Sequence, residues 1–136
     1  MTTPPALGAT LNQARLRVRQ GPLVAPVLSR VVGMLAARAQ CPIDRLDDAL
    51  LVADAVAAHS PSFTADGRVG VTVAAREHQL ELCVDELPAD GARDLLAAAE
   101  LPGVGNVLER VADEIVVETP AGEPERLVIR LGFAGV

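Results

Sequence analysis

The chain has 136 residues and a mass of 14.1 kDa, which fits one domain. Half of its residues are hydrophobic and 22% are charged, a balance that predicts a folded globular protein and excludes a disordered chain. The net charge of -6 argues against nucleic acid or an anionic membrane surface as a partner, and the absence of lysine excludes a P-loop and Schiff-base chemistry.

The two cysteines, Cys41 and Cys83, are too few for a disulfide framework or a zinc site. We interpret them as free structural thiols in a reducing cytosol rather than as redox groups. The N-terminus lacks the pattern of a signal peptide, and no stretch of membrane-spanning length is free of charge and proline. The sequence therefore predicts a cytoplasmic protein with no membrane partner.

The N-terminal part divides into a leader and the start of a domain. Residues 1–12 contain Pro, Thr and Gly and are predicted to be a flexible leader, followed by a single domain over 13–136. Apolar and basic residues alternate over 14–19, which predicts a half-buried strand. Its basic side is typical of a solvated strand face or of an edge strand guarded against pairing. The residues of that side are Arg15, Arg17 and Arg19.

Four helices are predicted. Apolar residues at helical spacing predict helices over 24–39 and 45–58, the second with Asp44 as its N-cap. An alanine-rich stretch predicts a short helix over 92–100, and another is predicted over 106–113.

Four further strands are predicted, as two pairs that each follow a pair of helices. Period-2 patterns predict a hairpin of strands 68–74 and 80–84, with 85–91 as a loop after it. Two later strands are predicted at 115–118 and 126–131, with a turn at 120–122 between them. This order predicts an α/β two-layer sandwich, in which helices cover one face of a mixed, mainly antiparallel sheet. The other face is expected to be wet, because polar residues alternate along the strands.

Two segments together suggest a family. The helix from Ile43 to Val56 has an acidic residue near its start and then a Val-Ala-Asp-Ala run, and the segment from Leu101 to Ile115 has Gly-x-Gly, a helix, and Asp-Glu entering a strand. In this order and spacing the chain resembles the ATP-binding anti-sigma regulatory factors. These are small serine-protein kinases of the GHKL superfamily, which includes the ATPase domain of histidine kinases. The resemblance spans about 15–131 and implies the Bergerat, or histidine-kinase-like ATPase, fold.

The resemblance also implies roles for individual residues. Asp54 matches the family's general base, and Asp85 matches the aspartate that binds the adenine amino group. Gly103 and Gly105 match the glycines before a helix N-terminus, where backbone amides can face phosphate. Taken alone, the same residues have simpler interpretations: Asp54 as a solvent-facing carboxylate, Asp85 as a turn residue, and the glycines as a turn between helices.

Two departures affect the expected nucleotide chemistry. Ala58 stands where the family has the asparagine that coordinates magnesium, and alanine offers no oxygen to a hard cation. Leu87 and Pro88 stand in the region of the family's first glycine pair, where they add a side chain and remove a backbone donor. We therefore expect no metal site and a site for ATP or ADP that is lost or weakened. A one-residue slip of the alignment near His59 would change the assignment of the metal ligand.

The resemblance leads to three functional hypotheses. The preferred one is an anti-sigma-factor-like regulator of transcription, a homodimer that binds a sigma factor or an anti-sigma antagonist through its surface. The alternative is an active serine/threonine kinase that phosphorylates the antagonist, with Asp54 as the base. The third is a structural subunit that only dimerises.

Overall fold

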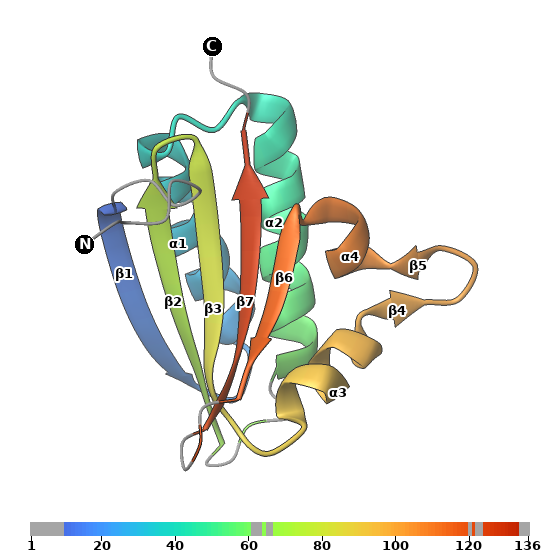
Figure 1. The fold of residues 1–136 in the computed structure, drawn as a ribbon. Coiled ribbons are helices and arrows are strands. Elements are labelled where there is room, and N and C mark those ends of the chain that lie inside the picture. The colour runs from blue at the N-terminus through green and yellow to red at the C-terminus, as the bar shows by residue number, and fades with distance from the viewer. Residues whose placement is uncertain (1–9, 61–63, 65–66, 120, 122–123, 134–136) are drawn as a thin grey trace.

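The computed structural model describes residues 10–60, 64, 67–119, 121 and 124–133. They form two layers, a five-stranded sheet and a set of helices that cover one of its faces (Figure 1). The α/β class, the two layers and the uncovered sheet face are confirmed. The main-sheet strands are β1 (Thr10–Arg19), β2 (Arg68–Arg76), β3 (Gln79–Leu87), β6 (Glu114–Glu118) and β7 (Glu125–Gly132).

The sheet has the order β1-β2-β3-β7-β6, so β1 and β6 are its edges in the described part of the chain. Each of its four pairings is antiparallel. The expectation of a mixed sheet is therefore wrong. Helices α1 and α2 separate β1 from β2 in sequence, yet these strands are neighbours, because the helix pair returns the chain to the same edge.

The helices are α1 (Val24–Arg38), α2 (Ile43–His59), α3 (Gly91–Ala98) and α4 (Val107–Val111). Helix α1 begins at Val24, which leaves Pro26 in the first turn, where its missing N–H is tolerated. The N-cap of α2 is Pro42 and not Asp44, because the helix begins at Ile43, two residues earlier than predicted, and Asp44 lies in its first turn.

Further boundaries differ from the predicted ones. Strand β1 begins at Thr10, so residues 10–12 are strand and not leader; residues 1–9 lie outside the described part. Strand β3 continues to Leu87 through a shift of register between Val84 and Leu87, so Asp85 is a strand residue and not the start of a loop. Glu86 adopts a φ of 59° inside this bulge. A short hairpin, β4 (Glu100–Leu101) and β5 (Gly105–Asn106), was not predicted.

The core lies between the sheet and the helices. Alternate residues of the central strands face α1 and α2 and are buried, which the period-2 pattern predicted. Fully buried members of this core are Leu28, Val32, Val52, Val56, Val71, Val73, Leu82 and Ile129.

The start of α3 is capped from another element. Helix α3 has no side-chain cap of its own, and its N-cap residue Asp90 has a φ of 65°. The Glu125 carboxylate of β7 accepts hydrogen bonds from the backbone N–H groups of Asp90, at 2.8 Å, and Ala92, at 3.2 Å. A carboxylate at this position accepts hydrogen bonds from backbone N–H groups that have no partner within the helix. Its negative charge also interacts favourably with the positive end of the helix dipole.

Candidate functional site

Asp54 lies on the outer side of α2, away from the sheet. Its side chain is exposed, and it makes no hydrogen bond or ion pair with another described residue. Ala58, four residues later, is exposed on the same side, as the helical spacing predicted. In the described part of the chain the structure therefore places no polar partner beside this aspartate.

Asp85 lies on the uncovered face of the sheet. Its carboxylate accepts hydrogen bonds from Thr72 Oγ1 at 2.9 Å and from Cys83 Sγ at 3.3 Å. The neighbouring residue Val84 points to the opposite side and is buried in the helix-covered core. Asp54 and Asp85 are therefore separated by the sheet, and they do not fit one nucleotide in the arrangement that the resemblance implies.

Gly103 lies in the turn of the β4–β5 hairpin, and Gly105 is the first residue of β5, where it pairs with Leu101. Both have positive φ angles, 77° and 96°, and an added Cβ at either would meet nothing within 4 Å. Glycine is therefore required here for the backbone conformation of the turn rather than for close approach. One backbone N–H group in the first turn of α4 already has a partner within the chain. Asn106 Oδ1 accepts a hydrogen bond from the Glu109 N–H at 3.2 Å.

The uncovered face holds a polar hollow of about 330 Å³. Small side chains of the middle strands, Thr72 and Cys83, form its floor, and charged side chains stand around it. The Arg130 guanidinium on one side contacts Glu81 at 2.8 Å and also Glu114. Most of these charges thus neutralise one another. The charged residues that line the hollow are Arg15, Glu81, Asp85, Glu118, Arg126 and Arg130.

The Cys83 thiol in this hollow is a hydrogen-bond donor and not a nucleophile. Burial, reinforced by the Asp85 carboxylate, raises the pKa of the thiol from 9.0 to about 12. Burial also raises the pKa of Cys41. Both cysteines are free, as predicted, and both are protonated at neutral pH.

The raised pKa of the Cys83 thiol predicts that the protein loses stability in alkali. The unfolded chain loses the thiol proton near pH 9 and the folded chain near pH 12, so the free energy of unfolding falls between these values. The chain has no lysine or tyrosine, so its cysteines are the side chains expected to titrate in this interval. Urea unfolding at a series of pH values should show the decline, and Cys83→Ala should make it shallower. An equal decline in Cys83→Ala would contradict the assignment.

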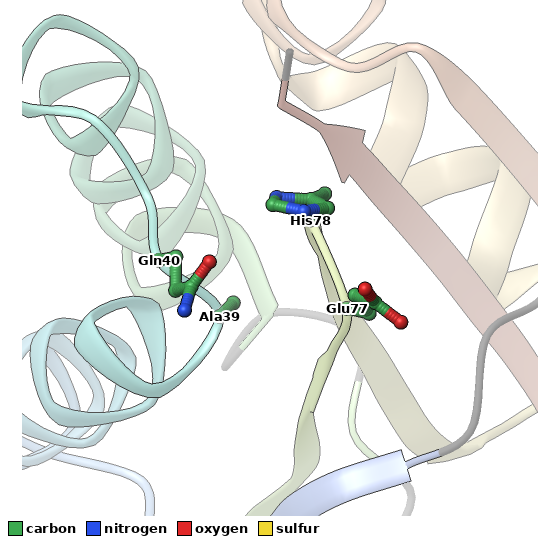
Figure 2. A pocket seen from close by; sticks show the side chains of 4 residues that line it. All are labelled: Ala39, Gln40, Glu77 and His78. Atoms are coloured by element: carbon green, nitrogen blue, oxygen red, sulfur yellow. The ribbon is translucent and has the colours of Figure 1, made fainter. Parts of the chain in front are cut away.

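A second pocket, of about 220 Å³, lies between the end of α1 and the β2–β3 turn. Figure 2 shows Ala39 and Gln40 on the helix side and Glu77 and His78 on the hairpin side. The His78 Nδ1 atom is buried without a hydrogen-bond partner. Gln40 and His78 both have positive φ angles, 59° and 55°.

The described residues contain no group of three or more His, Cys, Asp and Glu side chains placed to hold a metal ion. None of the helices in this part of the chain is both long and apolar enough to cross a bilayer.

An apolar surface lies where α2, α4 and the β4–β5 hairpin meet. Leu51 is 48% exposed on the same outer side of α2 as Asp54, and Val104 at the hairpin tip is 51% exposed. A hollow of about 310 Å³ lies between them, and Arg110 Nη1 at its rim donates a hydrogen bond to the Val104 carbonyl at 3.0 Å. We call this the α2–α4 surface; its apolar residues are Leu51, Val104, Val107 and Val111.

The α2–α4 surface was not predicted. Its signal in the sequence was the placement of Leu51 on the polar face of α2, seven residues from Ala58 and three from Asp54. Exposed apolar groups that gather in one place mark interaction sites more often than single exposed residues do. Figure 1 shows the hairpin projecting from the body of the protein beyond β6, where a partner can reach it.

A scan against models of protein families finds no matching family, and a search of curated proteins finds no matching sequence.

Proposed function

We propose that the protein is a regulatory binding module that acts by protein contact, with ATP binding lost or weakened. The observation that carries this proposal is the α2–α4 surface, where Leu51 and Val104 are each more than 40% exposed beside an apolar hollow. Interfaces gain most of their affinity from a few buried anchor side chains that fill such hollows. The resemblance to anti-sigma factors suggests the partner class, a sigma factor or an anti-sigma antagonist.

The arrangement of the carboxylates supports contact rather than phosphate transfer. Phosphoryl transfer needs a metal held over the phosphates and a base beside the acceptor hydroxyl. Here the expected base, Asp54, and the expected adenine contact, Asp85, lie on opposite sides of the sheet, and Ala58 takes the place of the metal ligand. A binding module needs the fold and its surface, but it does not need a base, an adenine contact and a metal ligand in one pocket.

The test is complex formation with the purified sigma factors and anti-sigma antagonists of the source organism. We expect one of them to form a stoichiometric complex, measured by light scattering and calorimetry. Leu51→Asp combined with Val104→Asp should weaken it by about 100-fold, because charges would enter the apolar contact. Both side chains are about half exposed, so the variant should remain folded.

Met34→Asp is the matched control, because Met34 is 64% exposed on α1, outside the α2–α4 surface. It should bind the partner as tightly as the wild type does. A complex that tolerates the α2–α4 substitutions would contradict the proposed surface. Magnesium-dependent transfer of phosphate to an antagonist would instead support the kinase.

A further inference from the structure

Strand β1 is an edge strand with one unpaired side. It pairs antiparallel with β2 from Thr10 to Arg19, and no other described strand lies beside it. Its outer backbone N–H and C=O groups are therefore available to another chain, since an edge strand is a template for strand addition. Figure 1 shows β1 at the opposite side of the sheet from the β4–β5 hairpin, so this edge is separate from the α2–α4 surface.

The side chains of β1 on the uncovered face of the sheet are strongly basic, although the protein as a whole is acidic. Arg15, Arg17 and Arg19 occur at alternate positions and are all exposed, while the whole chain has a net charge of -6. Arg15 and Arg19 form no ion pair with another described residue, and Arg17 contacts Glu86 at 3.3 Å with its side chain 48% exposed. In the β1–β2 register Arg68 lies directly across from Arg19. The row is therefore a local positive field that favours carboxylates.

The helix-facing side of β1 is only partly covered. Leu16 and Val18 pack against the core but remain half-buried, whereas Val71 and Val73 of the neighbouring strand are fully buried. Beyond the end of β1 lies a mostly apolar hollow of about 210 Å³, which Val18, Pro22 and the exposed Leu23 help to line. An added strand would place apolar side chains on this side and carboxylates on the other, because successive side chains of a strand alternate.

We propose that the β1 edge binds an extended acidic segment of a partner protein by strand addition. Carboxylates at alternate positions of that segment face the arginine row, and apolar side chains between them cover Leu16 and Val18. The backbone of the segment pairs with the free side of β1. This contact is independent of the α2–α4 surface, so either proposal can fail without the other.

Other occupants fit this edge less well. A second copy that paired its own β1 across a two-fold axis would set one arginine row against another, and like charges across a strand pair are destabilising. The β6 edge of a second copy offers Glu114 and Glu118, but these already contact Arg130 and Arg126 of their own chain. Nucleic acid would use the arginines but would leave the strand backbone unpaired.

The test is the binding of a fluorescent octapeptide of alternating glutamate and valine to the whole protein, followed by anisotropy. We expect saturable binding that weakens with salt, with amide shifts in NMR spectra concentrated in β1. Arg15→Glu combined with Arg19→Glu should weaken binding at least about tenfold. Arg30→Glu combined with Arg93→Glu, which changes two exposed helix arginines by the same charge, should weaken it far less. Arg15→Gln combined with Arg19→Gln should give an intermediate loss and serves as a milder variant if the first does not fold.

Three outcomes would overturn the proposal. One is the absence of peptide binding at millimolar concentration. Another is equal binding of a block peptide with four glutamates before four valines, or of an oligonucleotide of equal charge, which would mean attraction of any anion without strand pairing. The third is self-association of the wild-type protein that the Arg15 and Arg19 substitutions abolish, which would make a second copy the occupant.

Discussion

Replacing Arg45 by methionine is expected to lower the free energy of unfolding by about 2–3 kcal/mol. Arg45 lies in the first turn of α2, and its guanidinium joins three other parts of the chain. Nε donates to the Gly132 carbonyl at the end of β7 at 3.3 Å, and Nη1 donates to the Val111 carbonyl at the end of α4 at 3.0 Å. Nη1 and Nη2 also contact Asp48 and Asp113, each at 2.8 Å.

Methionine would keep much of the apolar stem of Arg45 but none of its donors. Two carbonyls and two carboxylates would lose a partner, and unsatisfied polar groups cost more than a hydrogen bond gains. The expected loss of unfolding free energy is modest because Asp113 is 60% exposed, and water can replace part of its contact with Arg45. Urea unfolding followed by far-ultraviolet circular dichroism measures the change. Arg30→Met, at an exposed arginine of α1, should change stability by less than about 0.5 kcal/mol. Equal effects of the two substitutions would show that the network contributes nothing specific.

Leu108→Ala should cost about 3 kcal/mol of unfolding free energy. Leu108 is fully buried, and it is the single buried residue of the five-residue helix α4. Such a short helix has little stability of its own, so its anchor in the core decides whether it forms. Removal of the side chain would leave a cavity between α4 and the core.

The substitution should also weaken partner binding, because α4 carries Val107 and Val111 of the α2–α4 surface. Val107→Ala is the control for the change in stability alone, since Val107 is only partly buried, and it should lower the free energy of unfolding by about 1 kcal/mol or less. Hydrogen exchange should show faster opening of α4 and the β4–β5 hairpin in Leu108→Ala. An unchanged exchange pattern would mean that this region is held by other contacts.

Much of the fold could be predicted from local patterns. Helices α1 and α2 have apolar residues at helical spacing over several turns, and their predicted ranges agree with the structure within two residues at each end. Apolar residues recur at every second position in β3 and, as Val69, Val71 and Val73, in β2, so the buried faces of these strands were predictable. Arg15, Arg17 and Arg19 are exposed as that alternation requires.

The errors arose where distant residues decide the local structure. Asp85 resembles the first residue of a loop, but β7 pairs along β3 to Leu87 and holds the segment in the sheet. Glycines at 103 and 105 predicted a turn, yet the β4–β5 pairing that uses this turn depends on where α3 and α4 pack. The contacts of Arg45 connect residues up to 87 positions away, so no local pattern indicates them.

The candidate site was the least predictable feature. A resemblance in order and spacing placed Asp54 and Asp85 in one expected pocket, but whether an aspartate at the end of a strand faces the helices depends on a register of one residue. Here Gln79, Glu81 and Cys83 of β3 lie on the side away from α2, and Asp85 follows them before the register shifts ahead of Leu87. The exposed apolar surface around Leu51 depends on the position of the hairpin, which the sequence pattern did not include.

Calorimetric titration of the purified protein with ATP, with and without magnesium, tests the central claim most directly. The separation of Asp54 from Asp85 predicts no saturable heat in either condition. Circular dichroism of the same sample would show that the protein is folded during the titration. Saturable binding of ATP that requires magnesium would contradict the claim that this protein acts by contact alone, and it would favour the kinase.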